Sequence, residues 1–250
     1  ELGLADGFAT WRHATATPPH PLPLTGHLRD GAPEDADRVV GRARGWLRDA
    51  PDRGFLLWVH LFDPHIPYTH AEDPWTSRRA VEPDAPQALR DETWDAYLAE
   101  VAAADEALGT LLADLETRGF WEAGGVVVFT SDHGEEFWEH GGFEHGHSHH
   151  GEVTGVPLVI AGAGVVLGER GAPAGLADIA PTLLRVAGLN TDGPDLRTLD
   201  PADRIVAATG SLHGPHMQSA RARDQRVIQG PDGVRAFDLA LDPAERTTES

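Results

Sequence analysis

Uninterrupted apolar runs mark three candidate strands along the chain. They are residues 55–62 (FLLWVHLF), 126–130 (VVVFT) and 156–161 (VPLVIA). A strand that helices cover on both sides carries apolar side chains on both of its faces. The three runs therefore predict buried strands of a sheet.

Apolar residues at helical spacing mark three helices between and after these runs. The segments are residues 33–51, about 91–117 and 178–187. Asp105 lies on the apolar stripe of the second segment, which predicts a buried carboxylate with either a structural hydrogen-bonding role or a place beside a site. Strands that alternate with helices predict an α/β fold, in which helices flank a mostly parallel or mixed sheet.

The last part of the chain has a different pattern. Three short strand-like runs lie within residues 204–239, and a Pro-Asp-Gly turn at residues 231–233 joins the last two as a hairpin. This pattern predicts two domains. Residues 1–195 would form part of an α/β domain, and residues 196–250 a small antiparallel C-terminal subdomain.

The composition narrows the class of protein. The chain has 250 residues, 40% of them hydrophobic, so it can bury a substantial core. Its formal net charge is −20 and it contains no lysine, which argues against a nucleic-acid partner. It has no cysteine, which excludes disulfides and a cysteine nucleophile within it, and no apolar run long enough to span a membrane. The cellular compartment stays open.

Candidate chemistry follows the ends of the predicted strands, where ligands gather in open α/β sheets. Asp132 and His133 come directly after residues 126–130, and Gly134 permits the turn that would aim both side chains at one ion. An aspartate oxygen and an imidazole nitrogen suit a divalent metal. Because two ligands are too few, we expect further carboxylates or a nucleophile from another segment.

Other histidines are also candidates. His65 follows the first predicted strand and stands in a loop that two prolines fix, where either a catalytic or a packing role is open. His145 and His147 belong to a histidine-rich tract that could form one wall of the site or a solvated loop. We expect the other histidines of that tract to be solvated loop residues: His140, His149 and His150.

Several blocks resemble the sulfatase family of the alkaline phosphatase superfamily. They are FLLWVHLFDPHIPY, YLAEVAAADEALGTLL, VVVFTSDHGEEFWEHGGFEHGHS and VPLVI, followed by LADIAPTLLRVAGL. The resemblance covers nearly the whole chain, and its specific part is the SDHGE block joined to DPHxPY. It implies part of an alkaline-phosphatase-like fold and hydrolysis of sulfate esters, or in some relatives of phosphate or phosphonate esters, at a single divalent metal.

The resemblance also implies roles for individual residues. Asp132 and His133 match two metal ligands, the second of which is asparagine in many members. His65 matches the histidine that contacts the ester near its leaving-group oxygen. His147 stands where many members place an anion-binding lysine, with His145 as the neighbouring candidate.

The chain departs from the family pattern in important places. It lacks the C/S-x-P-x-R element, whose cysteine or serine becomes formylglycine, and the early aspartate pair that completes the metal site. Most members of the family have Leu-Tyr-Glu at the positions of His149, His150 and Gly151. We therefore expect the C-terminal part of a longer enzyme, inactive alone, with the formylglycine in a preceding segment.

Two other functions stay open: a phosphonate or phosphate ester hydrolase of the same superfamily, and a non-catalytic homologue that binds an anion or a protein partner with the half-site. We expect calcium, the usual ion of the family, with manganese or zinc as alternatives because one ligand is an imidazole. The expected partner is a small-molecule or carbohydrate sulfate ester, with no nucleic acid.

Overall fold

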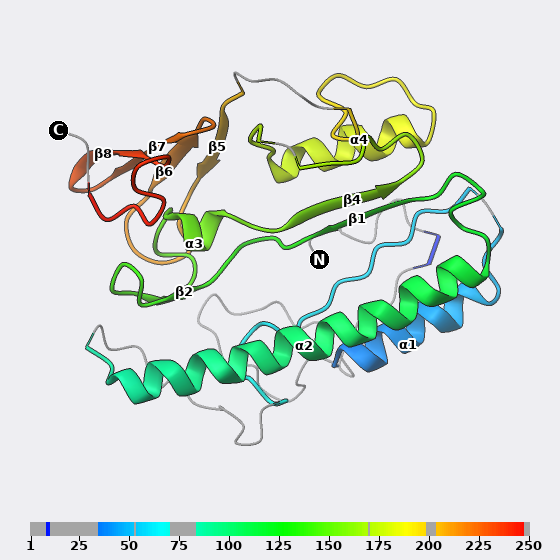
Figure 1. Cartoon of the computed structure of the whole chain (residues 1–250), viewed down its shortest axis with the longest axis horizontal. Coiled ribbons are helices and arrows are strands. Elements are labelled where there is room, and N and C mark those ends of the chain that lie inside the picture. Colours follow the sequence, from blue (N-terminus) through cyan, green and yellow to red (C-terminus); the bar gives the residue numbers. More distant parts are fainter. Residues whose placement is uncertain are drawn as a thin grey trace. The chain divides into compact units, whose positions relative to one another are not determined.

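The computed structural model describes residues 9–10, 35–52, 54–70, 84–169, 171–198 and 204–247. The chain divides into two compact units, residues 1–78 with 91–120 and residues 79–90 with 121–250, and each is described by itself. Figure 1 shows the helices and strands of both units and labels most of them.

The first unit contains α1 (Ala36–Leu47) and most of α2 (Gln87–Thr117), which confirms two predicted helices. The side chain of Asp35 caps α1 by accepting a hydrogen bond from the backbone N–H of Arg38 at 2.9 Å. Arg44 of α1 donates to both carboxylate oxygens of Asp114 of α2, at 2.7 and 3.1 Å. This two-point ion pair fixes the register between the two helices.

The predicted strand at residues 55–62 is wrong for the described structure. Side chains there alternate between half-buried and exposed, with Leu56 and Trp58 each more than half exposed. No described strand pairs with the segment, and a strand needs a hydrogen-bonded neighbour to exist as one. Phe55 instead packs its ring between those of Trp46 and Phe120, at centroid distances of 5.5 and 6.2 Å.

The buried face of α2 differs from the predicted stripe. Asp105 is exposed, so the expectation of a buried carboxylate at that position is wrong. The buried carboxylate of α2 is Glu100, which is 1% exposed. The large apolar residues of the stripe turn outward in the first half of the helix, where Trp94 and Leu98 are each 43% exposed. The apolar spacing therefore predicted the helix correctly, but it predicted the wrong buried face at Asp105.

The second unit contains β1 (Val126–Thr130) and β4 (Leu158–Gly162), which confirm two predicted strands. They pair antiparallel, with Val126 opposite Gly162 and Thr130 opposite Leu158. All strand pairs in the described residues are antiparallel, so the mostly parallel sheet stays untested. The chain returns from β1 to β4 without a long crossover helix, because α3 (Gly151–Thr154) has only four residues.

Short elements complete this part of the second unit. The loop after β1 holds a small ladder between β2 (Glu136–Phe137) and β3 (Phe143–Glu144). The 3-10 turn η1 (Leu176–Asp178) leads into α4 (Ile179–Val186), which confirms the third predicted helix. Among the described helices, none has the length and apolar character needed to cross a membrane.

The C-terminal strands form a four-stranded antiparallel sheet in the order β5–β6–β7–β8. They are β5 (Val206–Thr209), β6 (Gln218–Arg221), β7 (Gln225–Gly230) and β8 (Gly233–Asp238). The predicted hairpin joins β7 to β8, with Gly230 opposite Gly233. Met217, Ile228 and Phe237 form its buried cluster, against which Leu239 packs. The boundary predicted between residues 195 and 196 stays a prediction.

Candidate metal and anion site

Asp132 and His133 leave the end of β1 with their polar atoms on the same side. His133 Nε2 lies 3.7 Å from Asp132 Oδ2. His133 Nδ1 lies 2.8 Å from the carbonyl oxygen of Gly134, a pairing in which this nitrogen carries the proton and donates it. Nε2 then keeps its lone pair for a ligand, which is the usual arrangement of a metal-binding histidine.

These two side chains fit a divalent cation. One ion about 2.0–2.4 Å from each ligand atom bridges a separation of 3.7 Å without moving either residue. The Asp132 side chain is 68% exposed and that of His133 is 37% exposed, so both are open to an ion and to further ligands. As candidate ligands, Asp132 and His133 would leave the remaining coordination positions of an ion to other groups.

The turn after His133 requires glycine. The backbone N–H of Gly134 donates to the carbonyl of Val153 in α3 at 2.8 Å. A Cβ at position 134 would lie 2.0 Å from the backbone oxygen of Glu152. This close approach of two backbones ties the Asp132–His133 corner to α3 and keeps its direction.

His145 joins this corner from the far part of the same loop. Its ring stacks on that of His133 with the centroids 3.7 Å apart, and its Nδ1 pairs with Glu135 Oε1 at 3.0 Å. Burial works against a charge on His145, but the hydrogen bond and the charge of Glu135 outweigh it and raise the pKa of the imidazole. The structure thus brings together three of the five residues singled out in the sequence.

His147 is held by a buried carboxylate. Its Nε2 lies 2.9 Å from Oε2 of Glu136, which is only 1% exposed. The hydrogen bond to Glu136 raises the pKa of His147, although burial opposes it. Burial would also raise the pKa of Glu136, yet the hydrogen bonds from His147 and Gly142 and the charge of His147 lower it. The pair therefore favours an imidazolium beside a carboxylate.

The same histidine lines a cavity of about 190 Å³. The other walls come from the hairpin between β7 and β8, residues 230–233, and from Met217 and Arg235. His147 and Arg235, which can carry positive charge, line this cavity together with the acidic residue Asp232.

His65 belongs to the first unit, whereas the other four residues belong to the second. Its ring stacks on Phe62 at a centroid distance of 4.7 Å, and its Nδ1 lies 2.5 Å from the carbonyl oxygen of Ile66. Nδ1 therefore carries the proton, and the ring direction is set within its own loop. Its participation in the site stays a prediction.

The expectation of solvated loop histidines is wrong for His149 and His150. They are 6% and 2% exposed. His149 contacts Ser219 of β6 at 3.0 Å and the carbonyl oxygen of Gly210 at 2.6 Å. His150 Nδ1 lies 2.8 Å from a carboxylate oxygen of Glu245. Both histidines are buried because residues from the C-terminal part of the chain supply polar partners.

His140 is also drawn into this network. Its ring stacks on that of His150 at a centroid distance of 3.6 Å, and its Nδ1 lies 2.6 Å from Glu152. Its pKa is raised, because the hydrogen bond and the charge of Glu152 outweigh burial. His140 therefore has a structural partner and is not a freely solvated loop residue.

Sequence reasoning missed the carboxylates that position the histidines. Glu135 and Glu136 each hold one of the candidate histidines, ten or eleven positions further along the chain. The acidic pair directly after Gly134 was the available signal, because a histidine-rich loop that buries its rings needs carboxylate or carbonyl partners. Nothing in the spacing showed which glutamate would serve which histidine.

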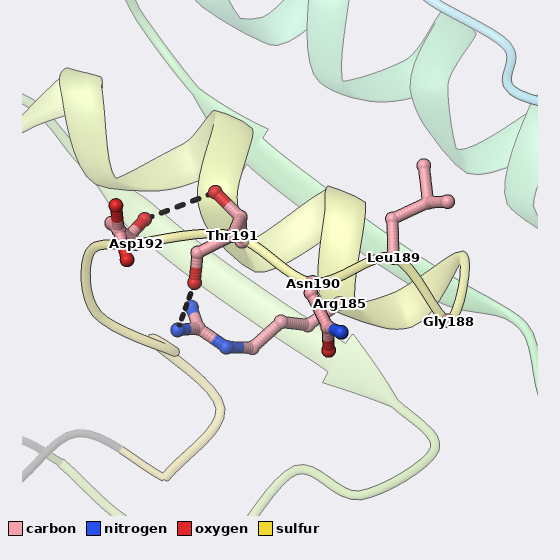
Figure 2. A pocket seen from close by; sticks show the side chains of 6 residues that line it. All are labelled: Arg185, Gly188, Leu189, Asn190, Thr191 and Asp192. Carbon is pink, nitrogen blue, oxygen red and sulfur yellow. Dashed lines mark hydrogen bonds between the residues drawn. The ribbon is translucent and has the colours of Figure 1, made fainter.

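A second, more open hollow of about 540 Å³ lies beside α4 (Figure 2). Its arginine, Arg185, donates to the backbone carbonyls of Thr191, Gly193 and Pro194 at 2.8–3.0 Å. Figure 2 shows this guanidinium turned to the loop that follows the helix. The arginine closes that loop, so it is already engaged and is not a candidate anion binder.

Comparison with known proteins decides the family. The sulfatase family model matches residues 6–189, which is more than half of the chain. The chain belongs to the sulfatase family. The choline-sulfatase of Rhizobium meliloti (strain 1021) is 31% identical over 166 residues, which are 61% of this chain and 32% of that sulfatase. The chain thus spans about a third of the length of the first curated relatives that it matches.

Solved structures share the fold. The structure of yidJ from Bacteroides fragilis has a TM-score of 0.68 at 18% identity and covers 88% of this chain and 55% of its own. A second structure, a complex with its substrate D-glucosamine-2-N,6-O-disulfate, has a TM-score of 0.53 at 25% identity, over 65% of this sulfatase chain and 38% of its own. The expected alkaline-phosphatase-like fold is confirmed at this level.

Proposed function

We propose that this sulfatase chain is the C-terminal part of an enzyme that hydrolyses sulfate esters at one divalent metal ion. The observation that carries the proposal is the Asp132–His133 corner at the end of β1, with an oxygen and a nitrogen 3.7 Å apart. This corner lies within the segment that the sulfatase family model matches. Membership of the family and a pair of ligands that fits an ion support the same function.

The residues of this chain would divide the work as follows. Asp132 and His133 would hold the ion, which when bound supplies Lewis-acid stabilisation of negative charge on the ester. His147, protonated beside Glu136, would donate a hydrogen bond to the anionic group. His145 would support His133 by stacking, and it is the neighbouring candidate for contact with the anion. His65 would contact the ester near its leaving-group oxygen.

The chain by itself supplies only part of this site. No C/S-x-P-x-R element occurs in its sequence, so the formylglycine nucleophile would come from elsewhere in the longer enzyme. Asp132 and His133 also leave most of the coordination positions of a divalent ion to other ligands. We therefore expect the 250-residue chain to show no turnover of sulfate esters alone.

Ligand chemistry limits the choice of ion. Calcium takes six to eight oxygen ligands, whereas manganese and zinc accept imidazole readily. Calcium is the usual ion of the family. His133 stands where asparagine is common, and its imidazole nitrogen favours manganese or zinc as the bound ion.

The substrate class is a sulfate ester of a small molecule or carbohydrate. A related structure has a sulfated glucosamine as its substrate, which supports a sulfated sugar here. The chain has a net charge of −20, so a sulfate ester is repelled at long range. Short-range attraction must then come from the ion and from cationic groups such as His147 and Arg235, which line one cavity.

The test is a comparison of three ester classes with the enzyme that contains this chain. Initial rates would be measured on 4-nitrophenyl sulfate, 4-nitrophenyl phosphate and a 4-nitrophenyl phosphonate. We expect the highest kcat/KM for the sulfate and a loss of about 100-fold or more in His147→Ala. His216→Ala removes an exposed imidazole of the same unit and serves as the matched control.

Two results would overturn the proposal. Faster turnover of the phosphonate or phosphate would assign the alternative hydrolase, and binding of sulfate without turnover of any ester would assign a non-catalytic homologue.

A further inference from the structure

A second cluster of potential metal ligands lies in the first unit and shares no residue with the Asp132–His133 pair. It consists of Asp63, His70 and Glu100. Asp63 and His70 bound the loop that carries His65, and Glu100 projects from α2. One ligand atom from each of the three lies within 4.8 Å of the other two. That spacing is about twice a metal–ligand distance, so a single ion can reach all three.

Glu100 orients the histidine. Its Oε1 accepts hydrogen bonds from the backbone N–H groups of Thr69 and His70, the latter at 2.7 Å, and its Oε2 lies 2.5 Å from His70 Nδ1. The carboxylate therefore fixes the end of the loop against α2 and keeps the imidazole of His70 beside it.

Asp63 is the observation that points to a missing ligand. The residue is 8% exposed and its side chain 1%. Its Oδ1 accepts from the backbone N–H of Ala36 at 2.8 Å and lies 3.9 Å from His70 Nε2. Within the part of the chain that the structure describes, its Oδ2 has no hydrogen-bond partner. A buried carboxylate oxygen without a partner costs about 1–3 kcal/mol or more. An ion at this position removes that cost.

The electrostatics of the cluster agree with this geometry. Burial raises the pKa of Asp63, and the charge of Glu100 adds to the effect although hydrogen bonds and His70 oppose it. Two buried carboxylates thus face one histidine, His70. A divalent cation supplies the charge that the cluster lacks.

We propose that Asp63, His70 and Glu100 bind one divalent transition-metal ion of the zinc type, at a site distinct from the Asp132–His133 corner. Two carboxylates and one imidazole suit zinc, because calcium prefers six to eight oxygen ligands. The ion joins both ends of the loop that carries His65 to α2. Its role is to hold that loop in place, and it takes no part in the chemistry of the ester.

The test measures zinc binding by the 250-residue chain, without a histidine tag, by isothermal titration and by metal analysis after dialysis. The chain has no cysteine, so thiolates cannot contribute. The background for every variant is Asp132→Asn with His133→Ala, which removes the other pair of ligands. We expect one zinc ion per chain in this background. We also expect Asp63→Asn and His70→Ala each to weaken binding by at least about tenfold.

The controls separate this site from incidental binding to histidines. His213→Ala removes an exposed imidazole of the second unit and should leave the affinity unchanged. The His70 side chain is 34% exposed, so His70→Ala should fold even if Asp63→Asn does not, and circular dichroism checks both. Equal zinc affinity in His70→Ala and the background, or no zinc bound at all, would overturn the proposal. Tighter binding of calcium than of zinc would overturn the assignment of the ion.

Discussion

The pair formed by Glu136 and His147 gives the sharpest test of how the site is built. Glu136 Oε1 accepts from the backbone N–H groups of Gly142 at 2.6 Å and His140 at 3.1 Å, and Oε2 faces His147 at 2.9 Å. Glu136→Gln keeps the acceptor for the two backbone groups. It removes the charge and places an NH₂ group opposite the imidazole.

The cost of Glu136→Gln follows from these contacts. A hydrogen bond to a charged group contributes about 1.5–3 kcal/mol. The His147 side chain is 31% exposed, so solvent screens part of the interaction, and we expect a loss of about 1–2 kcal/mol of unfolding free energy.

The effect of Glu136→Gln must depend on pH in a defined way. The pKa of Glu136 is lowered by folding, so its contribution is present above the usual value of about 4.3 and is lost as the pH falls through the folded value. The pKa of His147 is raised, so its contribution is complete below about 6.5 and is lost as the pH rises through the folded value. The pair is therefore most stabilising between about pH 4.3 and 6.5.

Urea unfolding at about pH 5.5 and pH 8.5 measures this difference, within and above the window set by the two pKa values. We expect the gap between wild type and Glu136→Gln to shrink at the higher pH, and the pKa of His147, followed by NMR, to fall in the variant. Glu122→Gln, an exposed glutamate of the same unit, should change stability by less than about 0.5 kcal/mol at both values. An equal gap at both pH values, with an unchanged pKa of His147, would show that the charge of Glu136 does not support the imidazole.

Three further substitutions test the packing around the site, each by urea unfolding. Glu245→Ala should lower the free energy of unfolding by about 3–5 kcal/mol, because it leaves Arg226 as an unpaired buried charge. The Arg226 side chain is 5% exposed and lies 2.7 Å from Glu245. A loss below about 1 kcal/mol would contradict this pairing. Ile228→Ala should lower the free energy of unfolding by about 2–5 kcal/mol, because Ile228 is fully buried in the C-terminal sheet. Val234→Ala, at an exposed position of the same sheet, serves as its control. Gly134→Ala should destabilise by more than about 2 kcal/mol, because its Cβ would lie 2.0 Å from the oxygen of Glu152, and a neutral result would show that the two backbones are not in contact.

The elements that the sequence revealed were those with a strong local pattern. Residues 126–130 form β1 as predicted, and the helix expected at 178–187 appears as α4. The hairpin between β7 and β8 follows its Pro-Asp-Gly turn. In contrast, β6 has the polar sequence QSAR, which carries no strand signal, and exists because strands on both sides pair with it. A strand that forms through tertiary pairing of this kind cannot be predicted from its own sequence.

Burial of polar residues was the least predictable feature. Asp105 was expected to be buried and is exposed, whereas Glu100, five positions earlier, is buried. The difference arises because backbone N–H groups of the loop at residues 69–70 offer partners to Glu100. In the same way, His149 and His150 are buried because Ser219 and Glu245 meet them from distant parts of the chain. Such partners depend on the fold and cannot be read from spacing.

The sequence predicted which residues of the candidate site follow a strand, but not how their side chains are arranged. The position of Asp132 and His133 directly after a strand followed from the sequence, and the structure places their ligand atoms 3.7 Å apart. The stacking of His145 on His133 and the support of His147 by Glu136 needed the path of the loop. These contacts set the direction of each imidazole, which residue identity alone does not.

We propose that the enzyme containing this chain hydrolyses sulfate esters with an ion held by Asp132 and His133. Sulfate release and metal content, measured on one preparation each of wild type and Asp132→Asn, test this proposal together. The substitution should lower bound metal and turnover together, and added metal should restore both in part. A metal-free preparation with full activity, or an Asp132→Asn variant that keeps its metal and its rate, would contradict it.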